Sequence, residues 1–223
     1  MQIPLSPETV IVLDFETTGM SPDHGDRPIE VGAVRIEGDM IVDRFQQLMN
    51  PGFTISWFIE SLTGIGNDLL ADAPDCETFM ARFADGIGDL LLVAHNAGFD
   101  SRFLDAELAA LGRQRTNPMA CTMLAARRLF PEAANHKLAT LVRHCGIRSG
   151  TFHRALADAE MTGHLWIAMT DLLKSRHGLL ATPFPLMQEL SRMGRAKVGR
   201  HLQDVARQQR ATVPPTGSPL WTN

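Results

Sequence analysis

Two acidic residues stand two positions apart at the end of an apolar run. Residues 10–13 read Val-Ile-Val-Leu, and Asp14, Phe15 and Glu16 follow at once. A short apolar run that is rich in β-branched residues predicts a buried strand. Because side chains alternate along a strand, Asp14 and Glu16 point to the same face. Two neighbouring carboxylates repel each other, and burying either one is costly unless a partner compensates its charge.

We expect the partner of these two acids to come from solution. No Lys or Arg lies within ten residues of the pair on either side. Carboxylate oxygens are hard ligands of the kind that Mg²⁺ and Mn²⁺ prefer. The pair Asp14 and Glu16 therefore predicts a divalent metal site. The alternative is a strand end with two solvated acids.

Two further acids lie at the ends of predicted elements later in the chain. Asp100 lies in the first turn of a predicted helix, directly after an apolar strand at 90–94. In open α/β sheets, functional groups gather beyond the carboxyl ends of the strands. Asp158 lies about one turn into a long predicted helix (151–173), and His153 stands near its start. The alternative for Asp100 is an acid that only complements the helix dipole, worth under ~1 kcal/mol.

Other predicted elements must position these acids. We expect strands at 29–36, 40–49 and 117–121, and helices at 57–63, 75–86, 100–111, 122–130, 137–145 and 186–206. Ser56 and Asp75 are predicted N-caps, and Gly64 is a predicted helix end. We interpret Trp57 and Phe58 as core residues, with a nucleotide platform as the alternative.

Length and charge indicate one main domain with a different tail. The 223 residues suit an α/β domain at 1–178 and a basic, Pro-rich C-terminal tail at 179–223. Residues 1–181 hold 15 Lys and Arg against 23 Asp and Glu, whereas residues 182–223 hold 6 against 2. The net negative charge of residues 1–181 argues against binding of nucleic acid over the whole surface, so any such contact must be local.

The sequence contains no apolar run long enough to span a bilayer, and its first residues lack the features of a signal peptide. We therefore expect a cytoplasmic protein. Cys76, Cys121 and Cys145 are far apart and odd in number, and they form no C-x-x-C pair. Reduced thiols in core or helix positions are the expected result.

Three motifs, in this order, resemble the DEDDh, or DnaQ-like, family of 3′→5′ exonucleases. They read Asp-Phe-Glu-Thr-Thr-Gly from Asp14, His-Asn-Ala-Gly-Phe-Asp from His95 and His-Arg-Ala-Leu-Ala-Asp-Ala from His153. The segment 59–65 (Ile-Glu-Ser-Leu-Thr-Gly-Ile) is similar to the family's stretch between the first two motifs. The resemblance covers about residues 9–175. The family includes the proofreading epsilon subunit of bacterial DNA polymerase III.

This resemblance implies a fold and a catalytic site. The fold is the α/β, RNase H-like one, with a mixed five-stranded sheet of three antiparallel and two parallel strands, flanked by helices, here with a C-terminal extension. The resemblance implies that Asp14, Glu16, Asp100 and Asp158 bind two divalent cations, Mg²⁺ or Mn²⁺, and that His153 is the general base. The chain has no tyrosine, which excludes the sister group that uses Tyr in place of this His.

The same resemblance suggests contacts to the 3′-terminal nucleotide. The candidate substrate-binding residues are Thr17, Thr18, Met20, His95, Asn96 and Phe99. The two threonines would offer backbone N–H groups, and Met20 and Phe99 would wedge or stack on bases. For Met20 the alternative is packing within its loop. His95 and Asn96 either contact the substrate or brace the site.

The expected function is hydrolysis of phosphodiester bonds from the 3′ end of single-stranded or frayed DNA, with release of nucleoside 5′-monophosphates, in proofreading or repair. One alternative is an RNA-trimming ribonuclease or oligonucleotidase of the same family. A second is a non-catalytic nucleic-acid-binding module. The tail at 179–223 would bind a DNA polymerase subunit or nucleic acid, or be a solvated extension.

Overall fold

The computed structural model describes residues 9–148 and 154–212, and its centre is one mixed β-sheet. Within these residues, five strands pair in the order β3-β2-β1-β4-β5, with β1 antiparallel to β2 and parallel to β4. The strands are β1 (Thr9–Thr17), β2 (Pro28–Glu37), β3 (Met40–Leu48), β4 (Leu91–Ala94) and β5 (Met119–Cys121). The predicted sheet of three antiparallel and two parallel strands is confirmed.

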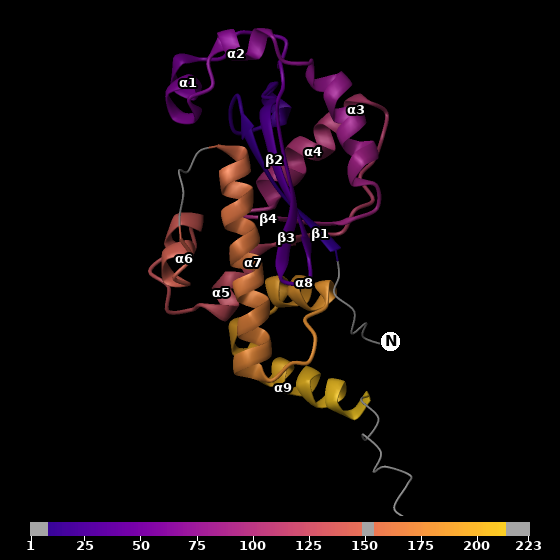
Figure 1. Ribbon diagram of the computed structural model, residues 1–223, viewed down its shortest axis with the longest axis vertical. Coiled ribbons are helices and arrows are strands. Elements are labelled where there is room, and N and C mark those ends of the chain that lie inside the picture. The colour runs from indigo at the N-terminus through magenta and orange to yellow at the C-terminus, as the bar shows by residue number, and fades with distance from the viewer. Residues whose placement is uncertain (1–8, 149–153, 213–223) are drawn as a thin grey trace, which may run out of the picture.

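Helices cover both faces of this sheet (Figure 1). Helices α3 and α4 pack on one face, and α7 packs on the other. The described helices are η1 (Pro22–His24), α1 (Trp57–Thr63), α2 (Asn67–Ala71), α3 (Cys76–Ile87), α4 (Gly98–Ala110), α5 (Thr122–Leu129), α6 (Leu138–His144), α7 (Ala155–His177), α8 (Phe184–Arg192) and α9 (Arg195–Thr212). No helix among the described residues has the length and apolar character needed to cross a membrane.

The alternation of side chains along β1 separates two hydrophobic clusters. Val10 and Val12 are buried in the cluster that contains α5, α7, α8 and α9. Leu13 and Phe15 are buried in the cluster that contains α3 and α4. The even-numbered positions therefore face α7. The two acids that follow on even-numbered positions continue along this face, past the packed part of the strand.

A glycine lets helix α7 begin very close to the sheet. A Cβ built on Gly32 of β2 would lie 2.0 Å from the backbone nitrogen of Leu156 and 2.1 Å from the carbonyl carbon of Ala155. Strand β2 and the first turn of α7 therefore meet backbone to backbone. A side chain at position 32 would push the start of this helix away from the strand.

The helix ends predicted between β3 and α3 are confirmed. The Oγ of Ser56 accepts a hydrogen bond from the backbone N–H of Ile59, and the Oδ1 of Asp75 accepts one from Thr78. Gly64 ends α1 in the left-handed conformation, with φ of 70°. The short helix α2 was not predicted, because a five-residue helix contains too little periodic pattern to be recognised.

The interpretation of Trp57 and Phe58 as core residues is wrong. Their exposed fractions are 79% and 65%. Helix α1 has seven residues and buries a single stripe, Ile59 and Thr63. Ile59 joins a small apolar cluster formed with Ile29, Ile55, Ile65 and Leu70. The two aromatic side chains lie off the buried stripe and are exposed to solvent.

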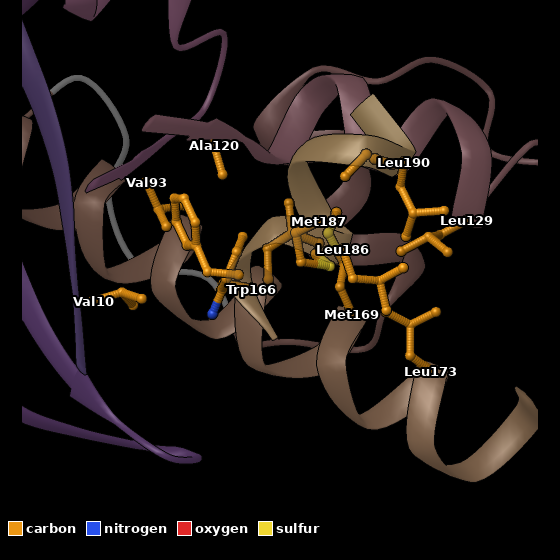
Figure 2. Packing of buried hydrophobic residues seen from close by; sticks show 14 of the residues in the cluster. Val10, Val93, Ala120, Leu129, Trp166, Met169, Leu173, Leu186, Met187 and Leu190 are labelled. Atoms are coloured by element: carbon orange, nitrogen blue, oxygen red, sulfur yellow. The ribbon is translucent and has the colours of Figure 1, made fainter. Parts of the chain in front are cut away.

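Residues 184–212 form two helices that belong to the hydrophobic core. Figure 2 shows Leu186, Met187 and Leu190 of α8 packed among Trp166, Met169 and Leu173 of α7. The single helix predicted at 186–206 is divided, because α8 ends at Arg192 and α9 starts at Arg195. A solvated extension is therefore excluded for 184–212. Residues 213–223 lie outside the described residues, and a domain boundary at 178 stays a prediction.

A buried amide joins α9 to the segment that follows α7. Gln209 is 1% exposed, and its Oε1 accepts hydrogen bonds from the N–H groups of Leu180 and Ala181, at 2.6 Å and 3.2 Å. Its Nε2 donates to the carbonyl of Ala181 at 2.7 Å.

Cys76, Cys121 and Cys145 are free thiols, as predicted.

If α9 is part of the core, truncating one of its buried side chains must destabilise the whole chain. We expect Leu202→Ala to lower the free energy of unfolding by about 2–5 kcal/mol, the usual cost of a core leucine. Leu180→Ala is the control, because Leu180 is half exposed. Urea unfolding of both variants measures the difference. Equal stabilities for the two variants would contradict this packing.

Candidate functional site

Three carboxylates come together at the end of β1. Asp14 and Glu16 come from the last residues of this strand, and Asp158 comes from the first turns of α7. One carboxylate oxygen from each residue lies within 4.8 Å of the other two. Oxygens at this spacing can bind one cation together, since Mg²⁺ and Ca²⁺ lie ~2.0–2.6 Å from their ligands.

The fourth predicted acid, Asp100, is held against the same stretch of β1. Its Oδ1 accepts a hydrogen bond from the backbone N–H of Phe15, at 3.2 Å. Phe15 lies between Asp14 and Glu16 in the strand. The side chain of Asp100 is 2% exposed. The structure thus brings all four predicted acids to one end of β1.

Burial and crowding raise the pKa of these carboxyl groups. Burial, followed by the charges of Asp100 and Asp158, raises the pKa of Asp14 well above its usual range. Burial and then the charge of Asp158 raise the pKa of Glu16 to about 7, and Arg154 has a smaller opposing effect. Burial raises the pKa of Asp100 to about 7, although backbone N–H groups oppose the shift. The donor set of carboxylate oxygens fits hard divalent cations, which would replace these protons.

Among the described residues, the guanidinium of Arg154 reaches this group of acids, and the sequence did not predict it. Arg154 forms an ion pair with Glu30 of β2, with 2.6 Å between Nη2 and Oε1. Glu30 is aligned with Glu16 across the β1–β2 pair. The signal in the sequence was Glu30 itself, the single charged residue in the apolar run 28–34. Arg154 is too far from Glu16 in the chain for a local sequence pattern to link the two residues.

The predicted general base, His153, lies outside the described residues. Its neighbour Arg154 is described and immediately precedes the first residue of α7. The role of His153 therefore stays a prediction.

The loop after β1 is closed by its own hydrogen bonds. The N–H of Thr18 donates to the carbonyl of Arg27 at 2.9 Å, and the Oγ1 of Thr18 accepts from the N–H of Arg27 at 3.0 Å. This N–H is therefore engaged within the protein, contrary to the expectation that Thr18 offers it to the substrate. Thr17 is buried, and its hydroxyl donates to the carbonyl of Gly19.

Met20 lies in this loop with 73% of its surface exposed, which excludes the alternative of packing within the loop. Phe99 is partly exposed, and its ring packs on Phe103, with 5.0 Å between the ring centroids. Asn96 has a left-handed backbone, with φ of 63°, and its carbonyl accepts the N–H of Phe99. Asparagine tolerates this conformation better than most residues.

His95 uses both ring nitrogens inside the protein. Its Nδ1 lies 2.9 Å from the hydroxyl of Thr122, and its Nε2 lies 3.0 Å from the carbonyl of His136. Burial lowers the pKa of His95 to about 4, so the ring is neutral near neutral pH. These contacts join the residue after β4 to the start of α5 and to the segment before α6. Of the two roles left open for His95, they favour bracing of the site over contact with the substrate.

Comparison with protein families gives one clear match. Residues 11–165 match the family model RNase_T, described as exonuclease. The chain is 42% identical over 166 residues to the PolC-type DNA polymerase III of Bacillus cereus and 41% identical over 167 residues to that of Bacillus subtilis. Each match covers 74% of this chain and 12% of the relative. The chain therefore spans about one eighth of the length of these relatives.

Solved structures agree with the fold. Exonuclease X in complex with 5′ overhanging duplex DNA is similar with a TM-score of 0.65 and 24% identity, over 82% of this chain and 99% of that one. The nuclease domain of 3′hExo bound to rAMP is similar with a TM-score of 0.64 and 21% identity, over 74% of this chain and 92% of that one. The RNase H-like fold implied by the three motifs is thereby confirmed.

The raised pKa values predict how metal-free protein responds to pH. Between the usual carboxyl pKa of 4.5 and the raised value of about 7, Glu16 keeps its proton in the folded protein but has lost it in the unfolded chain. The free energy of unfolding contributed by this site therefore falls as pH rises through that window. We expect wild type to lose stability relative to Glu16→Gln between about pH 5 and pH 8 in EDTA.

Urea unfolding of both proteins across this range measures the effect. A gain of wild-type stability relative to Glu16→Gln with rising pH would contradict the assigned shift. Calorimetry provides the matching readout, because Mn²⁺ that displaces protons must release them to the buffer.

Proposed function

This chain belongs to the exonuclease family whose model matches residues 11–165, and from that membership we propose that it hydrolyses DNA from the 3′ end in proofreading or repair. The resemblance to DEDDh exonucleases seen in the three motifs is confirmed by this match. The observation that carries the proposal is the cluster of Asp14, Glu16 and Asp158, whose oxygens are spaced to share a cation. Asp100 lies next to the cluster and accepts a hydrogen bond from the backbone N–H of Phe15.

The charge of the site supports two divalent cations. Asp14 is perturbed by four neighbouring acids, Asp100, Asp158, Glu16 and Glu30. These five carboxylates carry five negative charges when ionised, and Arg154 carries one positive charge. The remaining four negative charges equal the charge of two divalent cations. We propose Mg²⁺ or Mn²⁺, because both are hard and prefer oxygen ligands.

When bound, such cations supply activation of the attacking water and stabilisation of the leaving 3′ oxygen. The chain itself supplies the carboxylates that hold them and, in our proposal, the base. His153 would accept the proton of the attacking water, since a neutral imidazole can act as a general base at neutral pH. The product would be a nucleoside 5′-monophosphate.

Exposed apolar side chains support a single-stranded end. Met20 is exposed on the loop after β1, and Trp57 and Phe58 are exposed on α1. Such groups can stack on any base, so they suit a substrate without a fixed sequence. DNA is proposed because the curated relatives are DNA polymerases. RNA is the alternative.

The exposed face of α9 supports a proposal about partners. Its charged side chains are mostly basic, and these basic residues are exposed: Arg195, Lys197, Arg200, Arg207 and Arg210. We propose that a DNA polymerase subunit contacts this face or residues 213–223. A cytoplasmic location goes with this proposal.

We expect Asp14→Asn to abolish hydrolysis while the fold is retained, because it removes a central charge from the metal site. The experiment uses matched DNA and RNA oligonucleotides labelled at the 5′ end, with Mn²⁺ or with EDTA. Wild type should shorten the DNA one nucleotide at a time from its 3′ end, only with metal. Circular dichroism is the control for folding. Full activity in folded Asp14→Asn would refute the metal assignment, and faster cleavage of RNA would favour the alternative substrate.

We expect His153→Ala to lower kcat by about 10²–10⁴-fold, the usual contribution of a general base. Mn²⁺ affinity, measured by calorimetry, should stay unchanged, because an imidazole that accepts the proton of water need not bind the cation. A matched control is His164→Ala, which changes another histidine on α7, beyond its first turns. A loss of Mn²⁺ affinity as large as the loss of kcat would show that His153 has a different role.

A further inference from the structure

A carboxylate outside the predicted site occupies the junction between β2 and α7. Glu30 has no exposed surface. Its Oε1 accepts hydrogen bonds from Nη2 of Arg154 at 2.6 Å and Nε2 of Gln46 at 2.7 Å. Its Oε2 accepts from Nε of Arg154 at 3.2 Å and from the backbone N–H of Ala155 at 2.9 Å. Each oxygen of this buried carboxylate therefore accepts at least two hydrogen bonds.

The contact with Ala155 fixes the first turn of α7. Ala155 is the first residue of this helix, and its N–H has no partner within the helix. No side chain of the residue before the helix caps it, so Glu30 provides this cap from the sheet. Two residues along β2, Gly32 leaves the space in which the backbone of Ala155 and Leu156 sits.

This junction lies beside the carboxylate cluster. Glu30 is paired across the strands with Glu16, and Gly32 is paired with Asp14. On the helix side, the N–H of Asp158 donates to the carbonyl of Arg154 at 3.0 Å, within the turn that Glu30 caps. The position of the Asp158 carboxylate relative to β1 thus depends on where β2 holds Arg154 and Ala155.

Stability alone is a poor explanation for a charged group at this position. Replacing a buried ion pair by apolar residues of similar volume is often neutral or stabilising. Glu30 also lies close enough to Asp14 and Glu16 to repel them. An acid placed here adds repulsion to the site, which an apolar residue would avoid. The compensating gain is the orientation that its two oxygens impose on the start of α7.

We propose that Glu30 is a positioning residue of the metal site, which holds the first turn of α7 so that Asp158 reaches Asp14 and Glu16. Arg154 is its partner in this role, and the same contact anchors the residue that follows His153. The inference rests on the proposed function, since it concerns the same carboxylates. Glu30 acts on the metal site through the first turn of α7, and we do not propose it as a metal ligand.

Three variants of the full chain test this role. Glu30→Ala removes every hydrogen bond that the Glu30 carboxylate accepts, and Glu30→Gln keeps an oxygen that can accept from Ala155. Gln209→Ala is the matched control, because it also removes a buried side chain with three hydrogen bonds to backbone, in this case on α9. Figure 1 shows α9 at the other end of α7, away from the start of this helix. Each variant is measured for Mn²⁺ affinity by calorimetry, for kcat and KM on an oligonucleotide, and for urea unfolding.

We expect Glu30→Ala to lose about 10–100-fold in Mn²⁺ affinity and in kcat, the usual cost of removing a residue that orients a metal ligand. KM should change little, and Glu30→Gln should recover part of both losses. Gln209→Ala should lose stability only. Unchanged Mn²⁺ affinity and kcat in folded Glu30→Ala would overturn the proposal. If Glu30→Ala does not fold, Glu30→Gln decides: a lower Mn²⁺ affinity at unchanged KM supports the role, and wild-type values overturn it.

Failure of the proposed function would be visible separately. Wild type would then bind Mn²⁺ without shortening any oligonucleotide. In that case the Mn²⁺ affinities of Glu30→Ala and Gln209→Ala still decide whether Glu30 positions the carboxylates.

Discussion

The mutual repulsion of crowded carboxylates, two of them buried and three partly buried, is the constraint on which the rest of this structure depends. Asp14, Glu16, Asp100, Asp158 and Glu30 meet at one end of the sheet, and burial raises the pKa of three of them. Repulsion between these carboxylates opposes their approach to one another. The rigid elements around them must supply the force, and two of the acids belong to β1, a central strand of the sheet.

The fold keeps this repulsion away from the core by using the two-residue period of β1. Val10 and Val12 pack under α7, and the acids occupy the next two positions on the same face. The two valines and the two acids therefore lie on the same face of β1, but only the valines are packed in the hydrophobic cluster. Helix α7 has the same division: Asp158 lies near its start, and Trp166, Met169 and Leu173 are buried further along. Helices α8 and α9 extend the core at the far end, where they cover α7.

Local patterns were sufficient to predict the strands and the acids. The alternation in β1, the caps at Ser56 and Asp75 and the spacing of the motifs all depend on residues close together in the chain. The predictions failed where the answer depends on distant partners. Trp57 and Phe58 have the composition of a core, yet the short helix α1 has only one side that packs. The helices after residue 183 are buried because α5 and α7 offer an apolar surface, which no local pattern reveals.

Glu30 and Arg154 illustrate the same limit within the site. Glu30 looks anomalous in an apolar strand, but only the fold shows that its partners are the start of α7 and Gln46 of the neighbouring strand. A buried charge that is fully hydrogen-bonded gives little net stability, but it permits a single geometry. Apolar contacts at this junction would be non-directional, whereas the hydrogen bonds of a carboxylate to a backbone N–H and a guanidinium have a preferred geometry. Cation binding by several carboxylates needs that degree of order.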